Sequence, residues 1–204
     1  MPRKVVKLLA PVFGVLLLGA CSGGVTGGDA RPVSSSAAGT GNSDAGPLSG
    51  VPRVPKALDT ARFQKEPCGV LTAAQLQALG VAAQGEPNTT PAPKCAWSDW
   101  RGASKMDFSV TIATNRDGLA AVYRNRRNFE HFEPVEIESF PAVLLGGKEV
   151  QQGRCDAEVA VTDRLSFSAK VALDDKSKPE DYANPCARAK VVAAEVLKTM
   201  KAAS

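Results

Sequence analysis

The stretch Met106-Asp107-Phe108-Ser109-Val110-Thr111-Ile112 alternates strictly between apolar and polar side chains. Because successive side chains of a strand point to opposite faces of a sheet, this pattern predicts a strand with one buried face. Upstream, Cys95-Ala96-Trp97 has the same character, and Arg101-Gly102-Ala103-Ser104 separates the two stretches. The sequence therefore predicts an antiparallel hairpin.

A second hairpin is predicted in the C-terminal half of the chain. Residues 158–161 and 165–171 are rich in apolar and strand-forming side chains, and Thr162-Asp163-Arg164 lies between them. Residues 134–145 are also apolar and favour β-structure. We therefore expect three or so strands in this half.

Helices are expected beside the strands. In residues 71–80, Thr72 precedes Gln75 by three positions, which is the spacing of a capping box, and Gly80 fits the position after a helix. A second amphipathic helix should begin near Asn115 or Asp117. After this start, the apolar residues Leu119, Val122 and Tyr123 recur at the spacings of three and four that are typical of one helix face.

A terminal helix completes the expected fold. Asn184-Pro185 supplies an N-cap and a first-turn proline. One side of this helix carries Val192, Val196, Leu197 and Met200. The order of elements predicts an α+β fold, with an antiparallel sheet packed by helices.

The first twenty residues resemble a bacterial lipoprotein leader. A basic segment precedes an apolar run at residues 8–18, which is too short at about 1.5 Å per residue to cross a hydrocarbon core of roughly 30 Å. Leu18-Gly19-Ala20-Cys21 then resembles a lipobox, in which the cysteine receives a diacylglyceryl group and becomes the first mature residue. We expect residues 1–20 to be removed and Cys21 to anchor the protein at the extracytoplasmic face of the cell membrane.

The rest of the chain divides into a linker and a domain. Residues 21–57 are mainly Gly, Ser, Ala, Thr, Pro and Val without a periodic apolar pattern, so they cannot bury enough surface to offset their ordering entropy. We interpret them as the lipidated cysteine followed by a flexible linker. Residues 58–204 are expected to form the α+β domain.

The chain has 5 cysteines, which is an odd number. With Cys21 lipidated, four remain for disulfides in an oxidising compartment: Cys68, Cys95, Cys155 and Cys186. Four cysteines allow three pairings. The order of elements favours Cys68 with Cys95 and Cys155 with Cys186, because each pair then ties a helix to a neighbouring strand. Zinc is the alternative use, but the spacings contain no CxxC motif.

Several short motifs occur in order along the chain. They are the lipobox, Pro67-Cys68-Gly69-Val70-Leu71-Thr72, Cys95-Ala96-Trp97, Gly153-Arg154-Cys155 and Asn184-Pro185-Cys186-Ala187. In this order they resemble actinobacterial lipoproteins of the domain-of-unknown-function 3558 family. The resemblance implies a cell-envelope protein with a PsbP/Mog1-like α+β fold, broadly similar to extracellular sensor domains of mycobacterial kinases. It implies no catalytic residues.

Charge and motif content narrow the function further. The net charge of +4 falls to +1 without the three basic residues of the leader, Arg3, Lys4 and Lys7. This charge is not typical of a nucleic-acid-binding domain. A single histidine and the lack of GxSxG, HExxH, Walker-type and GxGxxG motifs favour a protein that is not an enzyme and needs no cofactor or metal.

Four residues are candidates for binding. Arg124, Arg126 and Arg127 form a basic cluster, which fits either anionic headgroups and phosphorylated glycans or an ordinary solvated helix face. Trp97 and Trp100 lie three apart in a predicted strand, so they should point to opposite faces. One of them is expected in the core, and Trp100 is our candidate for lining a cleft.

Two other features have alternative interpretations. His131 lies near the carboxylates of Glu130 and Glu133, and is either a pH-sensitive group or a partly exposed loop residue. Gly146-Gly147 predicts a tight turn at positive φ. Taken together, the sequence predicts a lipid-anchored, non-enzymatic envelope protein that binds a small molecule or glycolipid in a cleft between sheet and helices. The alternative is an interaction or sensor-accessory module of an envelope complex.

Overall fold

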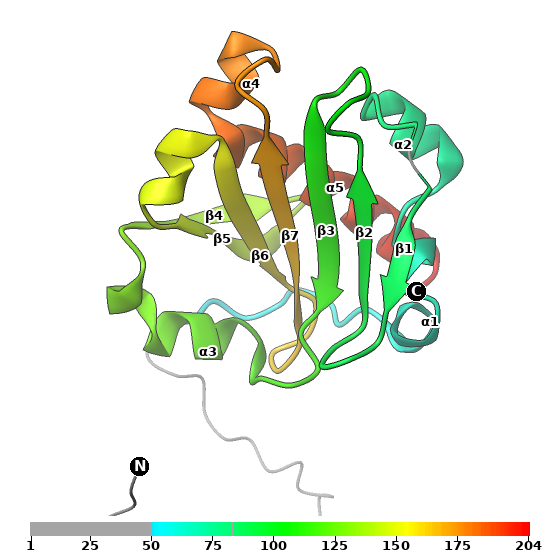
Figure 1. Ribbon diagram of the computed structural model, residues 1–204. Helices are drawn as coiled ribbons and strands as arrows, with labels where there is room; N and C mark the ends of the chain where they lie inside the picture. The colour runs from blue at the N-terminus through cyan, green and yellow to red at the C-terminus, as the bar shows by residue number, and fades with distance from the viewer. Residues whose placement is uncertain (1–49, 83) are drawn as a thin grey trace, which may run out of the picture. The chain divides into compact units, whose positions relative to one another are not determined.

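The computed structural model describes residues 50–204 apart from residue 83. The predicted signal peptide, Cys21 and the linker up to residue 49 lie outside the described residues. In the described part, a seven-stranded antiparallel sheet forms the centre (Figure 1). Its strands are β1 (Glu86–Asn88), β2 (Lys94–Ser98), β3 (Met106–Ile112), β4 (His131–Ile137), β5 (Phe140–Gly146), β6 (Arg154–Ala160) and β7 (Ser166–Leu173).

The strand order is β1-β2-β3-β7-β6-β5-β4, so β7 pairs with β3 after the β4-β5-β6 meander. Both predicted hairpins form, as the pairs β2-β3 and β6-β7. The apolar stretch at 134–145 is part of a further hairpin, β4-β5, whose two turn residues Glu138 and Ser139 have positive φ. The edge strand β1 was not predicted, because its three residues are all exposed and show no alternation.

The helices are short except for the last one. They are α1 (Ala61–Lys65), α2 (Ala73–Ala78), α3 (Gly118–Arg124), α4 (Pro179–Ala183) and α5 (Pro185–Ala202), with 3-10 turns η1 (Pro67–Val70), η2 (Arg126–Asn128) and η3 (Lys148–Gln152). The predicted caps are confirmed: Thr72 and Gln75 form a capping box at α2, and the Asn184 side chain accepts a hydrogen bond from Ala187 N at α5. Among residues 50–204 with the exception of 83, no helix has the length and apolar character of a membrane span.

The helix α5 packs across one face of the sheet, behind the strands in Figure 1. Its side chains Ala189, Val192, Ala193, Val196, Leu197 and Met200 are fully buried. They join the apolar sides of β3, β6 and β7 in one hydrophobic cluster, and burial of this surface is the main driving force of folding. We call this side of the sheet the covered face. Its side chains fill the space in which we expected a ligand cleft.

Two disulfides fasten other elements to the sheet. Cys68 of η1 is bonded to Cys95 of β2, and Cys155 of β6 is bonded to Cys186 of α5. The sequential pairing is therefore confirmed. Residues Ala45–Ser204 form one compact unit. This unit contains the sheet, both hydrophobic clusters and both disulfides, so it has a hydrophobic core of its own.

The opposite face of the sheet is covered at one corner by α3. Leu119 and Val122 pack there against Val143 of β5 in a second cluster. Gly118 permits this close approach, because its φ is +49 and a Cβ atom would lie 2.8 Å from the Arg164 carbonyl carbon. We call the rest of this side, over β2, β3, β7 and β6, the open face.

The prediction of a positive-φ turn at Gly146-Gly147 is wrong. Gly146 ends β5, and Gly147 has φ −111 before η3. The glycine at 146 is needed for space, since a Cβ there would lie 2.6 Å from Val150 Cγ2. The left-handed residue of this segment is Gly153, with φ 76, which ends η3.

Candidate functional site

A shallow hollow lies in the open face, where neighbouring strands carry small side chains. Ser109 of β3 stands opposite Ala96 of β2 and Lys170 of β7. The hollow has a volume of about 280 Å³, and its floor includes Ala96, Ser109 and Ala172. Because these side chains are short, the longer residues around them form a rim.

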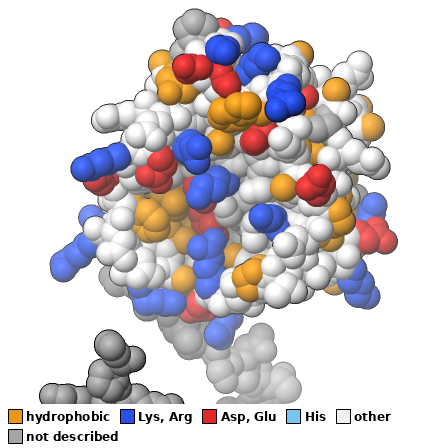
Figure 2. Space-filling model, viewed as in Figure 1, with side chains coloured by type: hydrophobic (Ala, Val, Ile, Leu, Met, Phe, Trp, Pro, Cys, Tyr) orange, Lys and Arg blue, Asp and Glu red, His pale blue; other side chains and the backbone are white. Residues whose placement is uncertain are grey.

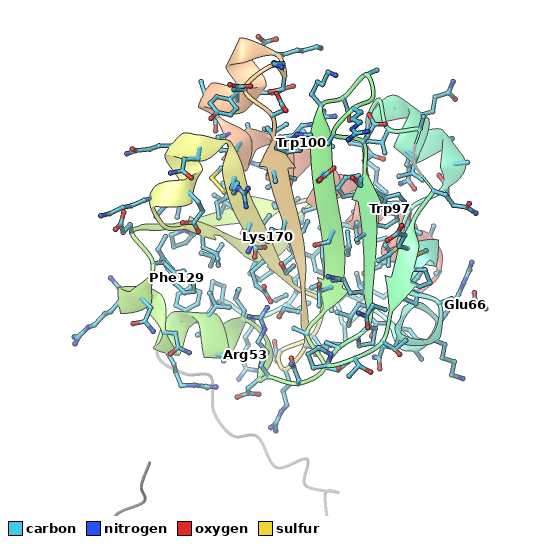
Figure 3. All side chains as sticks on the ribbon, in the orientation of Figure 1. Arg53, Glu66, Trp97, Trp100, Phe129 and Lys170 are labelled. Atoms are coloured by element: carbon cyan, nitrogen blue, oxygen red, sulfur yellow. A yellow bond between two sulfur atoms is a disulfide. The ribbon has the colours of Figure 1, made fainter. Side chains whose placement is uncertain are left out.

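The rim of this hollow is charged. Lys94, Lys170 and Arg154 contribute three cations, and Glu86 and Asp107 contribute two carboxylates. Lys170 and Arg154 are exposed, and Lys94 is half-buried. Figure 2 shows Lys and Arg side chains running down the middle of this face with Asp and Glu beside them, and Figure 3 places Lys170 near the centre. The excess of cations favours an anionic group in the hollow.

A second hollow of about 300 Å³ lies beside the first. Lys94 lines both, so the two are neighbours along β2. The second hollow is also lined by Asn88, Thr111 and Arg116, which offer an amide, a hydroxyl and a guanidinium. The two hollows together present cations and hydrogen-bonding groups along the open face.

Two carboxylates of β6 lie beneath this cationic surface. Glu158 is only 1% exposed, accepts a hydrogen bond from the Ser166 hydroxyl, and pairs with Arg116 at 2.5 Å between Nη2 and Oε2. Asp156 accepts a hydrogen bond of 2.5 Å from Ser168 Oγ. Both acids therefore have specific partners on β7 or in the loop before α3.

Burial raises the pKa of both carboxyl groups. The pKa of Glu158 rises from 4.5 to about 7, because desolvation of the carboxylate outweighs the attraction of Arg116. The pKa of Asp156 is raised by the same cause, with Ser168, Lys170 and Arg116 opposing it. The charge of the open face consequently changes near neutral pH, and it becomes more positive as Glu158 takes up a proton.

Comparison with protein families identifies the chain's relatives. A family model described as "Protein of unknown function (DUF3558)" matches residues 16–199, which is most of the sequence. The chain belongs to the DUF3558 family. No curated protein and no solved structure matches it.

In this DUF3558 chain, the two tryptophans lie in different environments. Trp97 is buried in the core and stacks on Phe108 with ring centroids 4.8 Å apart. Trp100 lies in the turn after β2, where its backbone N–H donates to Asp107 Oδ1 at 3.1 Å. It is half-buried beside a separate hollow, near the end of the sheet shown in Figure 3. One tryptophan is therefore in the core as predicted, but Trp100 is a turn residue and not part of the strand.

The predicted arginine cluster lies away from these hollows. Arg124 ends α3, and Arg126 and Arg127 lie in η2. All three are exposed, and Arg124 Nη1 lies 3.3 Å from Asp117 Oδ2. The structure thus places the three arginines together at the corner of α3, separate from the open-face residues.

His131 is the first residue of β4 and not a loop residue. It lies 3.6 Å from Glu133, measured from Nε2 to Oε2. Its ligand atom and the sulfurs of Cys155 and Cys186 lie within 4.8 Å of one another, but those sulfurs are bonded to each other. This grouping is therefore part of the disulfide's surroundings.

In this DUF3558 chain, the open-face residues were not among the candidates predicted from the sequence. They are Lys94, Arg116, Arg154, Glu158 and Lys170. The sequence did contain a sign of a polar face here, since every second residue in parts of β6 and β7 is polar, and such residues share one face of the sheet. A charged residue, Glu158, directly before the apolar run Val159-Ala160-Val161 also indicated this polar face. Only the strand order showed that β2, β3 and β7 bring these residues together.

Proposed function

We propose that this DUF3558 member is a lipid-anchored, non-enzymatic protein of the cell envelope that binds a small molecule or a glycolipid headgroup on its open face. The observation that carries the proposal is the hollow of about 280 Å³ with a floor of small side chains and a rim containing Lys94, Lys170 and Arg154. Such a rim suits a phosphate or carboxylate, and the short side chains of the floor leave space for a small group such as a sugar ring.

The non-enzymatic character is supported by the placement of reactive groups. The sequence contains one histidine, His131, and it lies in β4 beside the Cys155–Cys186 disulfide. Ser166, whose hydroxyl donates a hydrogen bond to Glu158, is fully buried. A histidine base and an accessible serine nucleophile therefore do not meet on the open face.

The ligand proposal is tested with glucose 6-phosphate and glucose as probes. We expect amide chemical shifts of Ser109 and Ala172 to change with glucose 6-phosphate and not with glucose. Replacing Lys170 and Arg154 by glutamine should weaken this binding roughly tenfold, because two ionic contacts are lost. The matched control removes two exposed lysines elsewhere, Lys148→Gln and Lys178→Gln.

Affinity for the phosphate probe should also increase as the pH falls from about 8 to about 7, where the phosphate remains mostly a dianion. Protonation of Glu158 in this range removes the negative charge that pairs with Arg116 in the neighbouring hollow. Equal binding by the open-face variant and the control would contradict the proposed site. Recovery of one cross-linked envelope protein in cells, lost on substitution of Lys170 and Arg154, would favour the interaction module instead.

The anchoring step has its own test. Cys21→Ala should release the protein from the membrane fraction of cells, because the lipid attachment point is removed. A Ser22→Ala variant serves as the control and should stay with the membrane. Continued membrane association of Cys21→Ala would show that the lipobox interpretation is wrong.

A further inference from the structure

We propose that the corner of the domain around α3 is a contact surface for a membrane rich in anionic lipids. Five exposed arginines define this surface: Arg53, Arg124, Arg126, Arg127 and Arg164. They come from the start of the described chain, from α3 and η2, and from the β6-β7 loop. The proposal is independent of ligand binding on the open face.

The charges at this corner are only partly compensated. Asp117 lies 3.3 Å from Arg124 and 3.5 Å from Arg164, so one carboxylate pairs with two guanidiniums. Asp163 accepts a hydrogen bond from the backbone N–H of Val54, so its carboxylate contacts the N-terminal part of the described chain. Arg126 and Arg127 have no ion pair within the described residues. The corner therefore keeps a positive charge that complements phosphate headgroups.

Half-buried aromatic side chains border the arginines. Tyr123 and Phe132 lie edge to face with ring centroids 5.3 Å apart, and Phe129 is 6.4 Å from Phe132. All three rings remain partly exposed, and Figure 3 shows Phe129 beside α3. A surface that combines aromatic rings with arginines suits the boundary between headgroups and acyl chains.

The N-terminal part of the described chain meets the domain at the same corner. Val51 and Val54 pack against the cluster formed by α3 and β5. Figure 3 shows Arg53 at this end. The described part of the chain therefore begins next to the arginines. An anchor at Cys21, which belongs to the proposed function, would keep this corner within reach of the bilayer.

The test measures vesicle binding without the anchor. Residues 21–204 with Cys21→Ala retain the compact unit Ala45–Ser204. We expect them to sediment with vesicles of equal parts phosphatidylglycerol and phosphatidylcholine, and not with phosphatidylcholine alone. Arg124→Gln, Arg126→Gln and Arg127→Gln together should lower the partition coefficient about 100-fold, since each cation near an anionic surface contributes roughly fivefold. Added salt should weaken binding.

A matched triple variant controls for total charge. Lys148→Gln, Lys176→Gln and Lys178→Gln remove the same charge from exposed positions near η3 and α4, at the far end from α3 in Figure 1. This variant should keep most of the binding. An equal loss in both triple variants, or equal binding to both vesicle types, would overturn the proposal. Neither outcome bears on the anchor at Cys21 or on the open-face ligand, which have separate tests.

Discussion

Replacing Cys155 and Cys186 together by alanine is expected to lower the free energy of unfolding by about 3–4 kcal/mol. The bond closes a loop of 31 residues and so restricts the unfolded chain, and in the native state it ties α5 to β6. The Cys68–Cys95 bond closes a loop of 27 residues, so its removal should have nearly the same effect. Loss of both bonds should remove about 7 kcal/mol, which is comparable with the whole stability of many domains.

Urea denaturation of the oxidised protein and the two double-alanine variants provides the measurement. Each variant should shift the midpoint to lower urea, and the melting temperature should fall by roughly 10 °C. The reduced wild-type protein is the control, since it lacks both bonds without any change of sequence. A loss below about 1 kcal/mol in either variant would show that the corresponding bond does not constrain the unfolded chain as argued.

Glu158→Gln is expected to reduce the pH dependence of stability. The pKa of Glu158 is raised from 4.5 to about 7 in the folded protein by burial. The folded state therefore holds this proton more tightly than the unfolded state. The contribution of this group to stability is therefore fully present below pH 4.5, decreases as the pH rises, and is lost, by about 3 kcal/mol, once the pH exceeds 7. Glutamine cannot ionise, but it keeps the shape of the side chain and an oxygen that accepts from Ser166.

Urea unfolding at pH 5 and pH 8 tests this expectation. Ionisation of Glu158 should make the free energy of unfolding of the wild-type protein lower at pH 8 than at pH 5. In the variant, most of this difference between the two pH values should disappear. Some dependence should remain, because the pKa of Asp156 is also raised by burial, with Ser168, Lys170 and Arg116 opposing the rise. Glu136→Gln, at an exposed position of β4, is the control and should keep the wild-type dependence. An unchanged slope in Glu158→Gln would contradict the assignment.

Local patterns predicted most of the secondary structure. The alternation in Met106–Ile112 identified β3 and its buried face, and the Thr72–Gln75 spacing identified the start of α2. The same reasoning missed the turn at Glu138-Ser139, since residues 134–145 read as one apolar stretch. Positive φ at two residues that are not glycine, asparagine or aspartate is a poor sequence signal.

The open-face residues in the proposed binding site were not predicted from the sequence. Trp100 and the arginine cluster were chosen because they are chemically conspicuous in the sequence. The open-face cations were missed because Lys94, Arg154 and Lys170 are far apart along the chain and ordinary one by one. Their grouping on one face depends on the pairing of β3 with β7, which joins the two halves of the sheet.

The sequence by itself predicted the α+β class and the family, and it favoured the sequential pairing of the cysteines among the three possible pairings. These follow from short-range periodicity, caps and the order of motifs, which act within a few residues of the chain. The tertiary structure decided which face of the sheet α5 covers and which face stays open. It also decided that Glu158 is buried beside Arg116, 42 positions away in the chain. Such placements arise from contacts between distant segments, whose energies depend on burial and strand order and not on local pattern.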